Sequence, residues 1–368
     1  MNIPTISTEQ LRQLLDRGAA VTVLDVRPAA ERAEWAIPGS VHVDAYAALR
    51  RGDPNALANF RPTNGGPVVT VCAAGQTSRL AAERLRARGM DAVSLEGGMR
   101  AWSLAWNAAE VPCGSTAQIV QVRRTGKGCL SYIIGSGGDA AVIDASLDPS
   151  VYRDLAGRYR WQIRWVIETH VHADHLSRAR ALARDTGATL HLPATDRVSF
   201  ERTPLRDRDA LRVGSARLQV LHTPGHTAES ACYFLDERVL FTGDTLFLGA
   251  VGRPDLEATP AEAHSRARLL HGSLRRLLEL PDDTLILPGH TSEPVAFDGR
   301  PIVAELQEVR ERTELLRAAE AEFVETILRR IPPTPPNHHR IVALNEAGTL
   351  PDGDPTELEA GANRCAVA

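Results

Sequence analysis

The chain of 368 residues exceeds the usual size of one domain, and its 43% apolar and 24% charged residues supply material for two packed cores. A net charge of −4, with no basic stripe interleaved with aromatic residues, argues against a nucleic-acid partner. No run of about 18 apolar residues occurs, so we expect a cytoplasmic protein without membrane contact. The scattered cysteines predict separate thiols rather than a disulfide framework; they are Cys72, Cys113, Cys129, Cys232 and Cys365. The oligomeric state, including a homo-oligomer, is left open.

The first hundred residues alternate strand and helix patterns. Residues 21–26 and 67–72 are rich in strand-forming residues, and residues 79–88 have helical spacing. This alternation predicts a small parallel α/β sheet with helices. The segment 106–118 loses periodicity and contains Pro112 and Gly114, so we expect a domain of residues 1–108, a linker at 109–116 and a domain of residues 117–368.

The second part is richer in strands than in helices. Strands are expected at 119–122, 129–135, 140–145, 163–170, 188–192, 216–222, 231–235, 238–244 and 284–290. Helices are expected around 150–159, 175–186, 261–279 and 302–329. Together they predict two sheets packed on each other and flanked by helices. After the Pro-rich residues 331–337 we expect an ordered arm that ends in a loose terminus.

Cys72 ends the second strand of the first domain and begins a strand-to-helix loop. Backbone N–H groups around Gly75, the start of the following helix and Arg79 would favour an ionised sulfur at this place. The alternative is a small apolar residue buried at a strand end, which is the usual place of a free cysteine. The loop favours a reactive thiol.

The motif CAAGQTSR at residues 72–79 resembles the active loop of rhodanese sulfurtransferases. Residues 24–43 and 95–102 are similar to two further segments of that family. The resemblance implies a rhodanese-like domain in which Cys72 carries a persulfide, with Arg79 in the catalytic loop. The chain departs from the pattern at Trp35-Ala36, where Gly-His is common, and we expect this change to affect packing rather than chemistry.

Seven potential metal ligands follow successive strands of the second part. Four belong to the run THVHADH at residues 169–175, and three follow later strands; the full set is His170, His172, Asp174, His175, His226, Asp244 and His290. Each residue alone has an ordinary explanation, such as a helix N-cap for Asp174 or a turn for Asp244. The set as a whole is far more specific and predicts a metal site.

The same residues resemble the H-x-H-x-D-H pattern of the metallo-β-lactamase superfamily, which implies an αββα sandwich. A binuclear hydrolase of the glyoxalase II type would use all seven, with His170, His172 and His226 on one ion, Asp174, His175 and His290 on the other, and Asp244 between them. A persulfide dioxygenase would bind one Fe(II) per chain through His170, His226 and Asp244. The other four residues would then orient ligands and substrate.

The domain content favours the dioxygenase, because a rhodanese moves sulfane sulfur, which does not serve a thioester hydrolase. Residues 241–257 also resemble persulfide dioxygenases. That resemblance implies O₂ and the persulfide of a small thiol, glutathione by default, as substrates, and thiosulfate or sulfite as partners of Cys72. It places Arg253 near the substrate, where its guanidinium could bind a carboxylate; a structural ion pair is an equal alternative.

Overall fold

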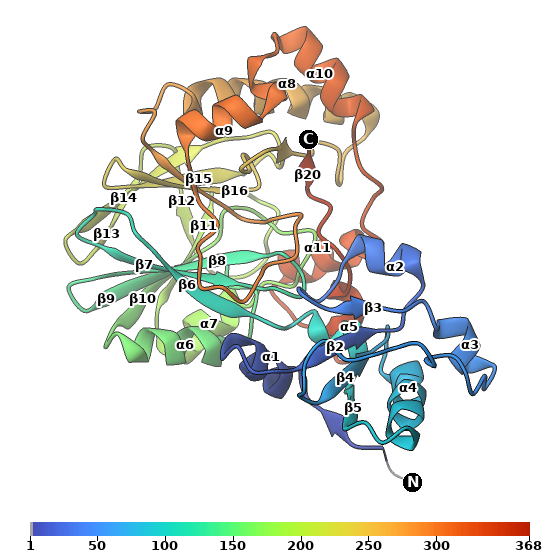
Figure 1. Cartoon of the computed structure of the whole chain (residues 1–368). Helices are drawn as coiled ribbons and strands as arrows, with labels where there is room; N and C mark the ends of the chain where they lie inside the picture. The colour runs from blue at the N-terminus through green and yellow to red at the C-terminus, as the bar shows by residue number, and fades with distance from the viewer. Residues whose placement is uncertain (1–2) are drawn as a thin grey trace.

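The computed structural model describes residues 3–368, so the first two residues of the predicted domain 1–108 lie outside the described residues. The first part forms a five-stranded parallel sheet of order β1-β5-β4-β2-β3 (Figure 1). Its strands are β1 (Thr5–Ile6), β2 (Thr22–Asp25), β3 (Val41–His42), β4 (Val68–Val71) and β5 (Ala92–Leu95). Its helices are α1 (Thr8–Asp16), α2 (Ala29–Glu34), α3 (Tyr46–Arg50), α4 (Gln76–Ala87) and α5 (Gly98–Trp102).

This sheet is covered on both faces, since every residue of β2 and β4 is buried. Alternate residues of β4 enter different cores: Val68 packs with Leu85 of α4, whereas Val69 packs with Leu11 of α1 and Trp102 of α5. The predicted parallel α/β domain is therefore confirmed.

The second part contains two large sheets (Figure 1). The seven-stranded sheet has the order β12-β11-β10-β9-β8-β7-β6, with β6 (Asn107–Val111), β7 (Gln118–Arg123), β8 (Leu130–Ser136), β9 (Asp139–Ile143), β10 (Gln162–Ile167), β11 (Thr189–Pro193) and β12 (Thr203–Leu205). The six-stranded sheet has the order β13-β14-β15-β16-β18-β19, with β13 (Ala210–Val213), β14 (Ala216–His222), β15 (Ala231–Leu235), β16 (Val239–Gly243), β18 (Leu285–Pro288) and β19 (Ala304–Glu305).

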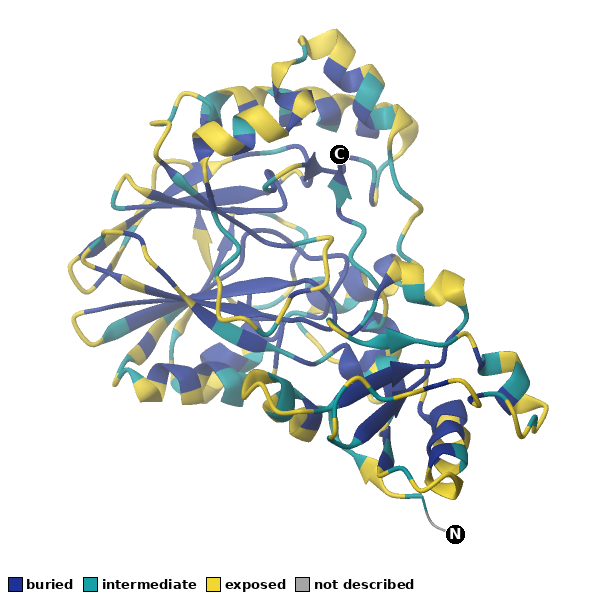
Figure 2. Cartoon of the chain, in the orientation of Figure 1, coloured by how far each residue is buried: buried dark blue, intermediate teal, exposed yellow. Residues whose placement is uncertain are grey.

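Helices cover the outer face of each sheet, and a core fills each of the three interfaces (Figure 2). The helices α6 (Pro149–Arg158) and α7 (Ala179–Thr186) pack on the seven-stranded sheet. The helices α8 (Pro260–Leu277) and α9 (Leu306–Arg312) pack on the other sheet, and α10 (Glu320–Arg329) packs against α8. The predicted αββα sandwich is confirmed. No helix among residues 3–368 combines the length and the apolar character needed to cross a membrane.

The segment predicted as a linker contains the end of a strand. β6 pairs antiparallel with β7 and forms the edge of the seven-stranded sheet, so residues 109–111 belong to the second domain. Its residues Asn-Ala-Ala-Glu include no β-branched side chain, and only tertiary pairing with β7 makes them a strand.

The ordered arm expected after residue 337 is confirmed, but the loose end expected for it is wrong. This segment forms α11 (His338–Ala347), α12 (Thr356–Glu359) and β20 (Ala366–Val367). β20 pairs antiparallel with β17 (Val251–Gly252), and Val367 is buried. The pairing joins segments that are remote in sequence, so local composition could not reveal it. The single helix expected at 302–329 is likewise interrupted, because a 3₁₀ turn at Glu314–Arg317 separates α9 from α10.

The two domains meet at the loop of residues 124–128. Arg124 donates from Nε to the carbonyl of Ser103 in the first domain, at 2.7 Å. The Trp35 ring lies against Gly128, where an added Cβ would come within 3.2 Å of it. Trp35, one of the two residues that depart from the rhodanese pattern, thus packs at the interface between the two domains.

A buried ion network beside this loop involves α12. Both Arg124 and Arg178 place Nη2 3.2 Å from Glu359 Oε2, and all three side chains are almost fully buried. Burial alone would raise the pKa of Glu359, but Arg124 and Arg178 outweigh it and hold this pKa below the ordinary value. The carboxylate therefore stabilises the folded chain above the ordinary glutamate pKa, and this contribution is lost as the pH falls through the lower folded value.

We expect Glu359→Gln to destabilise the chain by about 3–5 kcal/mol at neutral pH, because it leaves two buried guanidinium groups without their carboxylate. Urea unfolding of both proteins at neutral and acidic pH would measure the difference. The gap should narrow at acidic pH, where the native carboxylate also becomes neutral. An equal gap at both pH values would contradict the role of the charge.

Candidate functional site

The seven predicted metal ligands lie together in one buried region of the second domain. The four residues of the 170–175 run lie in the loop after β10, and His226, Asp244 and His290 follow β14, β16 and β18. All seven side chains are at most 2% exposed. The structure thus brings the whole set together.

Three of them form a group whose ligand atoms lie within 4.8 Å of one another, namely His170, His226 and Asp244. The Nε2 atoms of His170 and His226 lie 3.9 and 3.7 Å from Asp244 Oδ2. His226 Nδ1 contacts the carbonyl of Arg253 at 2.8 Å, which assigns the proton to Nδ1 and leaves a lone pair on Nε2.

These facing atoms are suited to a cation. Within residues 3–368, His170 Nε2 and Asp244 Oδ2 are buried without a hydrogen-bond partner. Leaving such atoms unsatisfied is costly, and a bound metal ion would satisfy them. Burial, followed by His172, lowers the pKa of His170 well below its usual value, and burial also lowers that of His226, so both imidazoles are in the neutral form that binds metals.

His172 lies outside the group of His170, His226 and Asp244, and its Nε2 faces other carboxylates. Its Nε2 lies 2.8 Å from Glu168 Oε2 and 3.2 Å from Asp144 Oδ1, whereas its buried Nδ1 has no partner among the described residues. Burial opposes protonation of His172, but Asp144 and Glu168 outweigh it and raise its pKa well above the usual value. The ring is therefore fixed in orientation by two carboxylates.

The remaining three residues contact one another. Asp174 lies 3.1 Å from His175 Nδ1 and 2.8 Å from His290 Nε2, and His290 Nδ1 lies 2.5 Å from Asp244 Oδ1. The contact between His290 Nε2 and Asp174 is short but lacks hydrogen-bond geometry. Asp174 is no helix cap, because α7 begins only at Ala179. These side chains are placed either to support the group of His170, His226 and Asp244 or to hold a second ion, which are the two roles predicted for them.

Cys129 joins this second group, which the sequence did not predict. Its Sγ lies 3.4 Å from Asp174 Oδ2 and 3.8 Å from His175 Nδ1. Burial and Asp174 oppose ionisation, but His175 and His290 outweigh them and lower the pKa of Cys129 to about 7. No local signal marks Cys129, because the antiparallel pairing of β8 with β9 and an isolated bridge to His290 bring it to this edge of the sheet.

The segment around β20 also reaches the centre. Asn363 Nδ2 donates to Asp174 Oδ2 at 3.0 Å, and Cys365 forms a group within 4.8 Å with Asp244 and His290. Burial and the carboxylates of Asp244 and Asp174 raise the pKa of Cys365 well above the usual value. No local signal in the sequence marks these two residues, because only the pairing of β20 with β17 brings them here.

Arg253 is fully buried, and its guanidinium contacts Asp255 and backbone carbonyls instead of the metal ligands. Its Nε and Nη2 donate to Asp255 at 2.8 Å each, and Nη1 donates to the carbonyl of Arg364 at 3.1 Å. Its backbone N–H donates to the carbonyl of Cys365. These contacts are those of the structural ion pair considered as the alternative. They do not support the prediction that Arg253 binds a substrate carboxylate.

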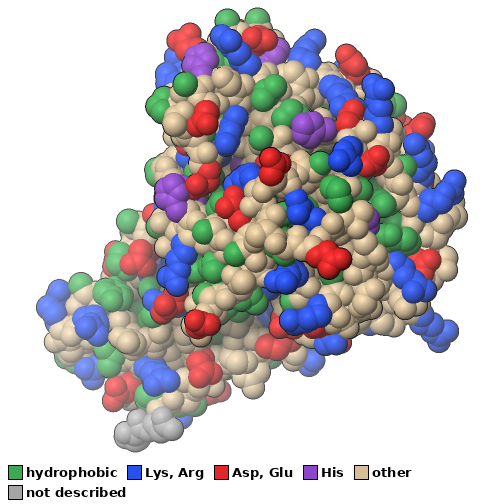
Figure 3. Space-filling view, turned by 180° about the vertical axis from the view of Figure 1, so that it is seen from behind, with side chains coloured by type: hydrophobic (Ala, Val, Ile, Leu, Met, Phe, Trp, Pro, Cys, Tyr) green, Lys and Arg blue, Asp and Glu red, His purple; other side chains and the backbone are tan. Residues whose placement is uncertain are grey.

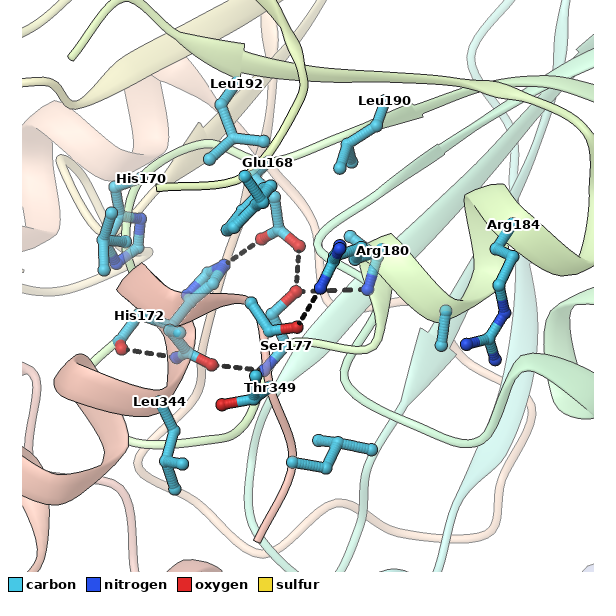
Figure 4. A pocket seen from close by; sticks show the side chains of 17 residues that line it. Glu168, His170, His172, Ser177, Arg180, Arg184, Leu190, Leu192, Leu344 and Thr349 are labelled. Carbon is cyan, nitrogen blue, oxygen red and sulfur yellow. Dashed lines mark hydrogen bonds and ion pairs between the residues drawn. The ribbon is translucent and has the colours of Figure 1, made fainter. Parts of the chain in front are cut away.

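A cavity of about 440 Å³ adjoins His170 and His172 (Figure 4). Apolar side chains such as Leu190 and Leu344 line it, together with Arg180 and Arg184. A smaller cavity of about 240 Å³ reaches His290 from the side of Asn363 and Ala366. The cluster of candidate metal ligands is thus bordered by one cavity beside His170 and His172 and by another beside His290.

Cys72 lies where the sequence predicts, between β4 and α4. Its side chain is 2% exposed, and Sγ lies 3.3 Å from Ser78 Oγ. Gly98 closes tightly on the loop, because an added Cβ would lie 2.2 Å from the Cys72 carbonyl oxygen. Arg79 lies exposed in the first turn of α4. The burial of Cys72 in an apolar core matches the alternative of a buried thiol at a strand end, and the catalytic roles of Cys72 and Arg79 stay predictions.

Family models match both parts of the chain. Residues 7–105 match the rhodanese-like domain and residues 124–290 the metallo-beta-lactamase superfamily. A hydroxyacylglutathione hydrolase of Methylobacterium sp. (strain 4-46) is 37% identical over 156 residues, which are 42% of this chain and 58% of that protein. One from Cereibacter sphaeroides is 38% identical over the same shares. The chain thus spans little more than half the length of these relatives.

Two solved structures resemble the second domain. ETHE1 from Myxococcus xanthus is 32% identical, with a TM-score of 0.54, over 62% of this chain and 97% of that one. A metallo-beta-lactamase from Staphylococcus aureus is 27% identical, with a TM-score of 0.58, over 64% of this chain and 74% of that one. The protein therefore belongs to the metallo-beta-lactamase superfamily and carries a rhodanese-like domain before its superfamily domain.

Proposed function

We propose that the protein is an iron-dependent persulfide dioxygenase coupled to a sulfurtransferase. The observation that carries this proposal is the convergence of His170, His226 and Asp244, whose ligand atoms lie within 4.8 Å of one another. Two of these atoms, His170 Nε2 and Asp244 Oδ2, are buried without a hydrogen-bond partner among the described residues. Two histidines and one carboxylate form the facial set typical of non-haem Fe(II) sites that activate O₂. The four other predicted ligands are in contact with one another or with neighbouring carboxylates, as expected of groups that orient a centre.

The domain composition supports the same proposal. A rhodanese-like domain supplies or removes sulfane sulfur, and a persulfide is the compound that both domains would share. The proposed reactions are S₂O₃²⁻ + RSH → SO₃²⁻ + RSSH at Cys72 and RSSH + O₂ + H₂O → RSH + SO₃²⁻ + 2H⁺ at the metal centre. Glutathione is the proposed carrier thiol, and the first reaction could run in either direction.

The residues of this chain would have distinct tasks in the second reaction. Fe(II), bound by the triad, would supply the oxygen and sulfur chemistry. The carbonyl of Arg253 fixes the tautomer of His226, and Thr169 Oγ1, at 2.9 Å from Nδ1, orients His170. His172, held by Glu168 and Asp144, and His290, held by Asp174 and Asp244, would provide or accept protons beside the reacting sulfur.

A binuclear hydrolase of the glyoxalase II type is the second candidate. It is favoured by the group of Cys129, Asp174, His175 and His290, whose ligand atoms also lie within 4.8 Å of one another. The hydroxyacylglutathione hydrolase relatives support it as well. In this version the two ions together would activate water for attack on a thioester.

Metal analysis separates the two candidates. We expect about one iron per chain in protein purified under anaerobic conditions, because only the triad is expected to hold iron. Elemental analysis should be combined with oxygen uptake on glutathione persulfide and with hydrolysis of a glutathione thioester. Two similar ions per chain with rapid thioester hydrolysis and no oxygen uptake would replace the dioxygenase by the hydrolase.

A further inference from the structure

A further group of metal-binding side chains lies outside the seven predicted ligands. It consists of Glu257, in the loop between β17 and α8, and of His338 and His339, the first two residues of α11. Their ligand atoms lie within 4.8 Å of one another, which is close enough for all three to bind one ion. The proposed reaction gives none of these residues a role.

Both imidazoles of this group meet one carboxylate oxygen. His338 Nε2 lies 3.2 Å from Glu257 Oε1, and His339 Nδ1 contacts the same oxygen. The side chain of His338 is 9% exposed, whereas that of His339 is 76% exposed. The group is therefore packed against the chain on one side and faces solvent on the other, so an ion can reach it from outside.

The backbone sets the tautomer of His338. Its Nδ1 lies 2.9 Å from the carbonyl oxygen of Pro335, which only accepts hydrogen bonds, so Nδ1 carries a proton. Among the hydrogen bonds of residues 3–368, the His338 ring takes part only in this one. In the neutral ring, Nε2 then presents a lone pair to Glu257. Histidines that bind metal are commonly held in this way, with the other nitrogen on a backbone carbonyl.

Two imidazole nitrogens and a carboxylate oxygen form a donor set that suits Zn²⁺, with water in the remaining position. A proton on His338 Nε2 would satisfy only the contact between that nitrogen and Glu257. One divalent ion would satisfy all three side chains. The two histidines begin α11, where the helix dipole disfavours a cation, so the negative charge of Glu257 is required for binding.

The group joins two segments that each hold a predicted ligand of the buried centre. In the loop that leads to Glu257, the carbonyl of Arg253 contacts His226 Nδ1 at 2.8 Å. In α11, Asn345 donates from Nδ2 to the carbonyl of His172 at 2.8 Å. An ion bound between the loop and the start of α11 would hold these two segments together.

We propose that Glu257, His338 and His339 form a separate zinc-type site that clamps the loop after β17 to α11. The site is structural, because it lies outside the group of buried ligands and one of its histidines is largely exposed. It does not depend on the proposed function, since the number and kind of ions at the buried centre do not affect its own ligands.

The test measures zinc in full-length proteins dialysed against the same buffered concentration of free Zn²⁺. We expect His339→Ala to bind one zinc ion fewer per chain than the wild type. The exposed side chain of His339 makes this variant unlikely to misfold, and ions at the buried centre contribute equally to both proteins. Equal zinc contents in the two proteins would overturn the site.

Two further variants define the ligands. Glu257→Gln keeps the shape of the side chain and removes its charge, so it should also lose one zinc ion. His264→Ala is the matched control, because His264 is exposed on α8 and belongs to none of the candidate metal groups among residues 3–368. It should bind as much zinc as the wild type. Zinc retained in Glu257→Gln, or lost to the same extent in His264→Ala, would refute the assignment.

Amide hydrogen exchange tests the clamp. Addition of Zn²⁺ should slow exchange in residues 253–257 and 338–347 of the wild type several-fold, because the ion restrains both segments. In His339→Ala, the same addition should leave exchange in these segments nearly unchanged. If the wild type binds the additional zinc ion without slower exchange in either segment, the clamping role is wrong.

Discussion

Replacing His170 by Ala should abolish metal binding and oxygen uptake on a supplied persulfide. The Nε2 of His170 is one of the three ligand atoms of the group, and it lies 3.9 Å from Asp244 Oδ2. Loss of a group that only orients a ligand already costs about 10–100-fold, so loss of a ligand should lower uptake by more than about a hundredfold. Iron content and oxygen-electrode rates measure both effects, and Asp244→Ala should behave alike.

His191→Ala provides the matched control for this experiment. His191 is also a buried histidine, on β11 beside the strand that leads to His170, yet it belongs to none of the candidate metal groups. It should retain iron and oxygen uptake. Sulfur transfer from thiosulfate should persist in His170→Ala, since Cys72 lies in the other domain. If His170→Ala kept its iron and its uptake, the proposed triad would be wrong.

Cys72→Ser should reduce sulfur transfer to the uncatalysed background, because a hydroxyl oxygen cannot form a persulfide. Oxygen uptake driven by thiosulfate and glutathione should vanish with it, while uptake on preformed glutathione persulfide should stay near the wild-type rate. A thiosulfate assay and an oxygen electrode measure the two activities. Retained transfer would show that another cysteine carries the sulfur.

A mixture of Cys72→Ser and His170→Ala chains shows how the two sites communicate. We expect thiosulfate-driven uptake to return in the mixture, because a released small persulfide can diffuse from one chain to the other. Full-length chains are the right material, since Arg124 donates to the carbonyl of Ser103 across the interface between the domains. A mixture that stays inactive, although each chain retains its remaining activity, would favour direct transfer within one chain.

The sequence predicts best what depends on local pattern. The seven candidate ligands follow strands whose apolar runs mark them clearly, so they could be named together without a structure. The choice of His170, His226 and Asp244 among them came from the resemblance to persulfide dioxygenases. The loop at Cys72 is similarly local, since strand, glycine and helix are adjacent in the chain. Both large sheets follow from the number of short strands and the few helices between them.

What could not be predicted depends on pairing between distant segments. Cys129 reaches the centre because its backbone lies beside that of His290, in an isolated bridge. Asn363 and Cys365 arrive only through the pairing of β20 with β17, and β6 is a strand only because β7 lies next to it. For Arg253, the motif suggested a substrate contact, but a carboxylate two residues later and carbonyls of the terminal segment hold its guanidinium.

The distribution of charged side chains was a limited guide to the partners of the protein. On the face shown in Figure 3, acidic and basic side chains are interspersed rather than gathered into a basic stripe. This agrees with the expectation of small-molecule partners, which stays a prediction. The formal charge of −4 says little about the interior, where buried histidines and carboxylates are concentrated at one centre.

The place of β20 has a consequence for the order in which the protein matures. During synthesis, His170, His226 and Asp244 leave the ribosome long before Asn363 and Cys365. Until β20 pairs with β17, the side of the centre bordered by Asn363 and Ala366 stays open, so metal could enter from there. Once the strand is in place, the cavity of about 440 Å³ beside His170 and His172 is the larger opening that remains next to the ligands. Metal loading would therefore be faster on the nascent chain than on the finished protein.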